Sequence, residues 1–187
     1  MFGLTFIDHL RLTFGHVIYS HRAHAQLAAR YTRWSRWLQG SEALLLLTTV
    51  VSSSAVLMTG ALFYAGLSAA AAALAVCIVV LRLVVDFDRR GDAHRACSAQ
   101  LWPIREHYRA LLADLRDGNV TLDQARQRRD VLLRTLQRVY ENAPPADRAA
   151  YEAARREIPA DHDLVLSDEE VDRFLPASLH VDSNPAA

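Results

Sequence analysis

The sequence predicts an all-α protein: a two-transmembrane helical hairpin with cytosolic amphipathic helices that form a bundle or coiled coil. Three observations support this fold class. Residues 43–81 are 39 consecutive positions without a formal charge. Apolar residues on both sides of that run recur at steps of three and four, which is the helical period. No segment shows the strict apolar and polar alternation of a half-buried strand.

Residues 1–41 are expected to form a cytosolic and juxtamembrane helical lead-in that runs into the membrane. Its apolar positions at helical spacing begin with Ile7, Leu10, Phe14 and Val17. Asp8, Arg11 and His16 interrupt the apolar pattern, so the first twenty residues lack the basic start and clean apolar core of a signal peptide. We therefore expect that this end is not exported.

Three aromatic residues precede the uncharged run, namely Tyr31, Trp34 and Trp37. Tyrosine and tryptophan are enriched where a transmembrane helix meets the membrane surface, so these residues are candidate interface anchors. Ordinary packing against the cytosolic helices explains them equally well.

Residues 42–83 are expected to form the hairpin. One crossing needs about 20 apolar residues, whereas a single straight helix of 39 residues would measure about 58 Å, which exceeds what tilt can absorb. Two glycines and two aromatic residues within 59–66 suit a tight turn, which predicts helices near 42–61 and 64–83. A buried helix pair in a soluble core is the alternative, but such cores rarely keep 39 positions free of charge.

The flanks of the hairpin predict its orientation. Arginines lie on both sides of it, beginning with Arg36 before and Arg82 after, while the connecting turn carries no charge. Because cytoplasmic loops retain arginines, we expect a multi-pass membrane protein with both termini in the cytoplasm. The lipid bilayer is then its first partner.

The first span contains a stripe of small hydroxyl residues. Thr48, Ser52 and Thr59 fall within about 40° of one another at 100° per residue. In lipid such a stripe mediates close helix packing, or it lines a water-filled path once several copies assemble. The second span, with alanines from Ala69 to Ala73 and at Ala75, presents a smooth surface suited to packing.

Residues 84–158 are expected to form a cytosolic helical bundle. Its first helix carries a heptad-like seam, an oligomer or bundle contact formed by Leu101, Ile104, Tyr108, Leu111 and Leu115. Pro103 predicts a kink or a helix restart. Asp117-Gly118-Asn119 ends that helix, and the capping box Thr121-x-x-Gln124 opens the next. Residues 159–187 form an acidic C-terminal tail that contains a second capping signature, at Ser167 and Glu170.

Little in the sequence suggests chemistry. His16, His21 and His24 could lie on one helical face as metal ligands, but no acid or cysteine completes a site. Asp86 to Gly91 imitates the start of a calcium loop without its bidentate glutamate. Asp161-His162-Asp163 has no nucleophile motif to join, and the arginines at 126–138 suit an anionic ligand or, more simply, a solvated face. We expect no catalytic residues, no metal, no cofactor and no nucleic-acid partner.

An aromatic lead-in is followed by the first span LLLLTTVVSSSAV, a tight turn, a second span ending in LRLVVDFDRR and the helix AHRACSAQLWPIREHYRALLADLRDG. This order of segments resembles the SLATT family. The resemblance covers about residues 15–160. It implies a two-transmembrane effector of bacterial conflict and antiviral defense systems, in which a nucleotidyltransferase or nucleotide-sensing partner releases a pore-forming protein. It further implies a location in the bacterial inner membrane. Because two spans in one copy cannot enclose a channel, we expect such a protein to act as a homo-oligomer. A membrane-anchored adaptor that does not conduct, presenting a cytosolic helical docking module, is the alternative.

Overall fold

The structure is a computed structural model that describes residues 5–145, 171–175 and 179–180. This part of the chain folds into four helices and contains no strand. They are α1 (Phe6–Thr59), α2 (Leu62–Val85), α3 (Phe87–Arg116) and α4 (Leu122–Glu141). The predicted all-helical class is therefore confirmed for the described residues.

Helix α1 is continuous over 54 residues, so the lead-in and the first span are one helix. Gly40 is the one break signal between Tyr31 and the span, and an isolated glycine costs a helix only about 1 kcal/mol relative to alanine. The residues on both sides of Gly40 continue the helix without interruption, and a single glycine in a helix of this length does not end it. The expected start at residue 42 is thus a change of composition, from charged to uncharged residues, and not a helix end.

The hairpin turn has the predicted length of two residues but lies two residues earlier in the chain than predicted. Helix α1 ends at Thr59 and α2 begins at Leu62, which leaves Gly60 and Ala61 between them. Gly60 has a φ of 65°, a left-handed conformation that glycine adopts without a steric cost. The Thr59 hydroxyl also accepts a hydrogen bond from the Ala61 N–H at 3.3 Å. The turn lies within the predicted window 59–66, and the second helix starts two residues before the expected position 64.

Helices α2 and α3 are separated by a single residue, Asp86. Its φ of 48° is left-handed, and its N–H donates to the carbonyl of Arg82. Its Oδ1 accepts a hydrogen bond from the N–H of Arg89 at 3.3 Å, so the same side chain caps the first turn of α3. Aspartate tolerates this backbone better than most residues because its short polar side chain bonds locally.

Of the two outcomes expected at Pro103, the helix restart is absent, because α3 continues through it to Arg116. Proline removes a single backbone donor, and the apolar side of α3 on both sides of it is buried, which keeps the helix intact. The predicted end of this helix is confirmed, with Gly118 at a φ of 69°. The capping box at the start of α4 is also present, with Thr121 and Gln124 exchanging both hydrogen bonds.

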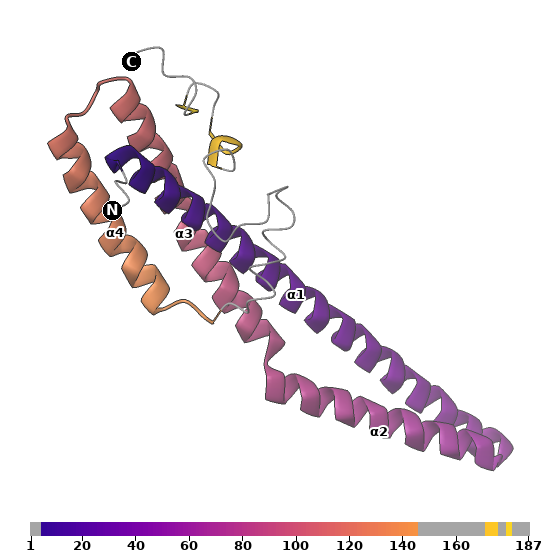
Figure 1. The fold of residues 1–187 in the computed structure, drawn as a ribbon. Helices are drawn as coiled ribbons and strands as arrows, with labels where there is room; N and C mark the ends of the chain where they lie inside the picture. The colour runs from indigo at the N-terminus through magenta and orange to yellow at the C-terminus, as the bar shows by residue number, and fades with distance from the viewer. Residues whose placement is uncertain (1–4, 146–170, 176–178, 181–187) are drawn as a thin grey trace. The chain divides into compact units, whose positions relative to one another are not determined.

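The described chain divides into two compact units. The first comprises residues up to Leu27 together with those from Ala93 onward, and the second comprises Ala28–Asp92, so the boundaries fall inside α1 and α3. In the first unit the beginning of α1 lies beside α3 and α4 (Figure 1). Its core contains Leu10, Phe14, Val17, Ile18, Leu101, Ile104, Tyr108, Leu111, Ala125, Leu136 and Val139.

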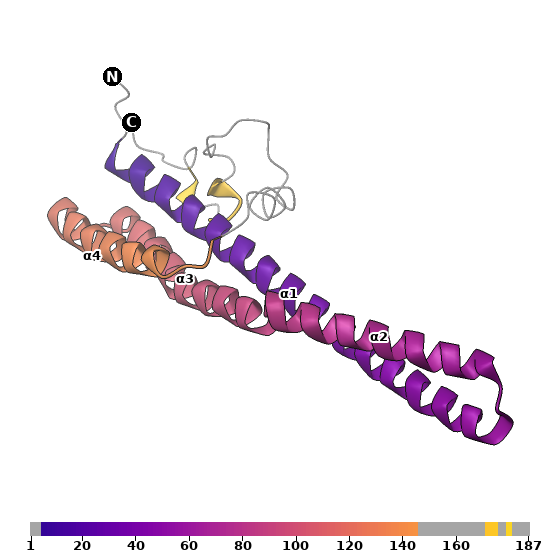
Figure 2. The same cartoon turned by 90° about the horizontal axis from the view of Figure 1, so that it is seen from below.

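The second unit contains the hairpin, in which the end of α1 and α2 run side by side in opposite directions (Figure 2). Two candidate membrane spans lie in the described residues, and in their most apolar windows only 6% and 11% of the residues are buried. A core helix pair of a soluble protein would be mostly buried. The hairpin instead exposes its apolar side chains, as a membrane-spanning pair does.

Candidate functional site

The two helices of the hairpin meet through small side chains. The hydroxyls of Ser53 and Ser68 are hydrogen-bonded across the pair at 2.7 Å, and the Ser68 hydroxyl lies 3.4 Å from the carbonyl oxygen of Thr49. Ala71 and Ala75 of α2 are buried. Small residues allow the two backbones to approach closely, and in lipid this packing holds helices together.

The hydroxyl stripe is divided between this contact and the outer surface. Ser52 is 3% exposed. Thr48 is half-buried and Thr59 is exposed, and their hydroxyls donate to the carbonyls four residues earlier, Leu44 at 2.9 Å and Ala55 at 2.8 Å. Ser52 therefore has the environment of a packing residue. The two threonines satisfy their own donors, so they can face lipid or water.

The Ser53–Ser68 pair was missed in the sequence because Ser53 lies off the stripe. The signal was present in the second span, where Ser68 is the one serine or threonine between Leu62 and Val85. A lone hydroxyl in an otherwise aliphatic span is expected to find a partner, since an unsatisfied donor in hydrocarbon is costly.

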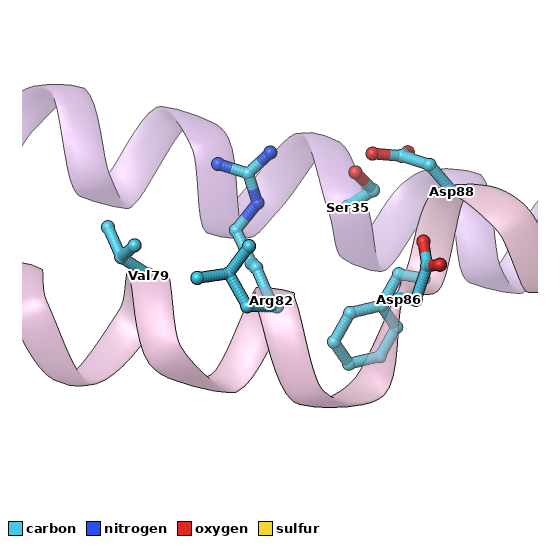
Figure 3. A pocket seen from close by; sticks show the side chains of 7 residues that line it. Ser35, Val79, Arg82, Asp86 and Asp88 are labelled. Atoms are coloured by element: carbon cyan, nitrogen blue, oxygen red, sulfur yellow. The ribbon is translucent and has the colours of Figure 1, made fainter.

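An ion pair connects the helices at the end of the uncharged run. Arg82 Nη1 lies 2.5 Å from Glu42 Oε2, and the two side chains are 28% and 21% exposed. These are the two charged residues that bound residues 43–81. Beside them, a pocket opens between α1 and the α2–α3 junction. Its polar lining residues are Ser35, Arg82, Asp86 and Asp88 (Figure 3).

The three candidate anchors differ in their surroundings. Trp34 and Trp37 are 54% and 71% exposed. Tyr31 is half-buried, with its ring centroid 6.3 Å from that of Phe87, and Gly91 packs close to its Cβ. The tryptophans thus have surface available to a membrane interface, while Tyr31 contributes to packing inside the second unit.

The heptad-like seam is used within the chain. Leu101, Ile104, Tyr108 and Leu111 are buried in the core of the first unit, and Leu115 packs against it. The seam faces apolar residues of α1 and α4 there. It is accordingly not available to a second copy in this conformation.

The histidines form a pair that the sequence did not predict. His24 Nδ1 lies 2.9 Å from Nδ1 of His94, and both rings are buried. Burial lowers the pKa of each, and for His24 the proximity of His94 lowers the pKa further. His21 does not join this pair, and its backbone carbonyl accepts a hydrogen bond from the Ser98 hydroxyl at 3.2 Å. No group of three or more metal-ligating side chains occurs among the described residues.

Part of the acidic tail packs on the first unit. Val171 and Leu175 are buried in its core, and Phe174 lies under the guanidinium of Arg22 at 5.0 Å. Arg11, itself buried, pairs with Asp172 and donates to the carbonyl of Leu179 at 2.7 Å. An arginine in an apolar helix face was the available signal, because a buried charge requires a partner.

Three of the five arginines of α4 have acidic partners. Arg126 pairs with Asp123 at 3.0 Å, Arg128 with Asp114 at 2.7 Å and Arg129 with Asp130 at 2.7 Å. These contacts fit the solvated-face interpretation. The sequence Asp161-His162-Asp163, and the capping signature at Ser167 and Glu170, lie outside the described residues.

Comparison with family models supplies the classification. The model of the SMODS and SLOG-associating 2TM effector domain family 4 matches residues 6–170. The chain belongs to this SLATT family. Its two apolar helices are long and apolar enough to be the two transmembrane segments that the family description names, and together the two findings indicate a membrane protein. Comparisons with curated proteins and with solved structures gave no match.

Proposed function

We propose that this SLATT chain is a non-enzymatic membrane effector that oligomerises and permeabilises the bilayer when a nucleotide-linked partner triggers it. The family description, with its effector and its SMODS and SLOG associations, supports the general role. The partner would be a nucleotidyltransferase or a nucleotide-sensing protein. Both termini lie in the cytoplasm in this proposal, because the arginines flank the hairpin on both sides and its turn is uncharged.

The observation that carries the proposal is the exposure of the hairpin's outer faces. At the turn end of the hairpin, the Leu57 side chain is 90% exposed, and Met58, Leu62 and Phe63 are also exposed. Two helices cannot enclose an aqueous path, so permeation requires several copies. Since the seam of α3 is used inside the chain, the outer faces of the spans are the surfaces left for lateral association in the membrane.

Thr48 and Thr59 are the proposed lining residues of the assembled path, and Ser52 supports the helix contact behind them. Their hydroxyl oxygens retain acceptor capacity after donating to the helix backbone, so they can bind water. A weakly polar lining of this kind lowers the barrier to water and small ions relative to an aliphatic one.

Induction of the protein and its trigger in bacteria, followed with a membrane-potential dye, tests this function. Replacement of Thr48 and Thr59 by valine removes the hydroxyls at constant shape, and we expect it to slow depolarisation about tenfold or more. Ser54→Ala is the matched control, because Ser54 bonds to its own helix at 3.0 Å and lies about 120° around it from Thr48. Normal polarisation in fully expressing wild-type cells would exclude the pore.

The second candidate is a membrane-anchored adaptor, which α4 favours. Leu122 and Tyr140 are exposed apolar residues on one side of this helix and Val131 is exposed on the opposite side, so each is available to contact another protein. A tether tolerates Thr48→Val and Thr59→Val but loses its function when Leu122 and Val131 are changed to serine. Pull-down with the trigger protein and the dye assay, applied to both variant sets, separate the two functions.

A further inference from the structure

A pocket of about 330 Å³ lies within the second unit, where α2 ends and α3 begins. Its volume falls at the lower end of the range for small-ligand sites. Ser35 of α1 contributes to it, and the remaining lining residues are Val79, Arg82, Leu83, Asp86, Phe87 and Asp88. The sequence had singled out Asp86 and Asp88 as an incomplete calcium loop, and the proposed function makes no use of them.

The pocket holds opposite charges on its two sides. In Figure 3 the Arg82 guanidinium points toward α1 at one end, and the carboxylates of Asp86 and Asp88 lie at the other end near Ser35. One nitrogen of Arg82 pairs with Glu42, and a guanidinium has five N–H donors, so others remain to bind a ligand. The Asp88 carboxylate has no hydrogen-bond or ion-pair partner among the described residues.

The position of the pocket relates it to the membrane surface. Arg82 is the first charged residue after the 39 uncharged ones, and the lining residues Val79 and Leu83 are part of the same apolar helix. Leu83 is well exposed, so a lipid chain can lie along it. Apolar residues toward the span and charged residues beyond it match the two parts of a phospholipid.

We propose that this pocket binds the phosphoethanolamine headgroup of a membrane lipid. The phosphate accepts hydrogen bonds from Arg82, the ammonium donates to Asp86 and Asp88, and the acyl chains follow Val79 and Leu83. This inference relies on the membrane placement in the proposed function, and it does not depend on pore formation.

The charges discriminate among headgroups. The lining has one arginine and two aspartates, so an anionic headgroup meets net repulsion. A quaternary ammonium has no N–H to donate to the carboxylates. A bare calcium ion prefers six to eight oxygen ligands, and here it would meet two carboxylates and the repulsion of Arg82. A primary ammonium joined to a phosphate satisfies both ends of the pocket.

The test uses the full chain, purified and delipidated in detergent. Phosphatidylethanolamine, phosphatidylcholine and phosphatidylglycerol with identical acyl chains are added in turn, and retained lipid is counted by native mass spectrometry. We expect phosphatidylethanolamine to be retained about fivefold more than the others, as for a partly exposed charge pair. Equal retention of the three lipids by wild-type protein would overturn the proposal.

The variant Asp86→Asn/Asp88→Asn removes the charge and keeps the fold. Asparagine tolerates the left-handed backbone at residue 86, and its side-chain oxygen can still accept from Arg89. We expect the lipid preference to disappear, while the control Asp123→Asn, on α4 of the first unit, retains it. A preference that survives in the double variant contradicts the assignment.

Two further measurements address misfolding of the double variant and binding of a soluble headgroup. If circular dichroism shows that the double variant is misfolded, Asp88→Asn alone provides the test, because that side chain is exposed and has no partner to lose among the described residues. Soluble phosphoethanolamine is added as a competitor. We expect it not to displace the lipid, since it lacks the acyl chains, and displacement at equal concentration would assign the pocket to a free metabolite.

Discussion

At the scale of the residue, polar atoms buried in the first unit determine where a substitution has its largest effect. Tyr108 is completely buried, and its hydroxyl has no hydrogen-bond partner among the described residues. Burial raises the pKa of this phenol to about 12, which keeps it neutral. The ring supports the core, while the hydroxyl is a desolvated polar group that stabilises nothing around it.

Replacement of Tyr108 by phenylalanine is therefore expected to raise the free energy of unfolding by about 1 kcal/mol, the usual cost of a buried unsatisfied donor. Chemical denaturation of the detergent-solubilised protein, followed by circular dichroism, measures it. Ile104→Val in the same core serves as a packing control, because it removes one buried methylene and should lose about 1 kcal/mol. A destabilised phenylalanine variant would show that the hydroxyl has a partner.

The His24–His94 pair is expected to make stability depend on pH. Both folded-state pKa values are lowered from 6.5, so the unfolded chain binds more protons in the range between the folded value and 6.5. The contribution of the two neutral histidines to the free energy of unfolding is fully present above pH 6.5. It is lost as the pH falls below 6.5, by at most about 1.4 kcal/mol per pH unit for each histidine. Thermal unfolding between about pH 7.5 and 5.5 measures the loss, which should be smaller in His94→Gln.

At the scale of the element, helix ends and helix contacts follow different rules. The ends are set locally, by Gly60 in the hairpin turn and by Thr121 at the start of α4. The contact between the spans depends on residues far apart in the chain, the Ser53–Ser68 hydrogen bond and the Glu42–Arg82 ion pair. The hairpin is thus closed by one polar contact near its middle and another at its charged end.

The Glu42–Arg82 pair is expected to stabilise the hairpin modestly. Both groups are partly exposed, so a double-mutant cycle with Glu42→Gln and Arg82→Gln should give a coupling of about 0.5–1 kcal/mol. The unfolding free energy in detergent measures it, and high salt should reduce it. A coupling of zero would mean that the two charges interact with solvent or lipid headgroups rather than with each other.

At the scale of the whole molecule, topology is the property on which the proposed effector function depends. Ala61 lies in the turn of the hairpin, and Asn119 lies in the exposed connection between α3 and α4. With Cys77 and Cys97 replaced by alanine, Ala61→Cys should react in intact cells with a maleimide that cannot cross membranes. Asn119→Cys should react only after lysis, and its labelling in intact cells would contradict the proposed orientation.

Much of this arrangement could be predicted from local pattern. The 39 uncharged positions predicted the two spans, and helical spacing identified Leu101, Ile104 and Tyr108 as one buried face. The capping box at Thr121 was correct because all its atoms lie within four residues. The restart considered at Pro103 does not occur, since the local cost of a proline is smaller than the stability that buried apolar residues give the rest of α3.

The sequence by itself determined the helical class, the two apolar spans and the helix ends around Gly118 and Thr121, because each depends on neighbours within a turn or two of the chain. Only the tertiary structure decided that Ser53 meets Ser68, that His24 meets His94 and that Arg11 meets Asp172. Such partners depend on the rotation and register of one helix against another, which side-chain packing sets. A periodic pattern predicts which face of a helix is buried. The residues that this face contacts belong to another helix, far away in the sequence.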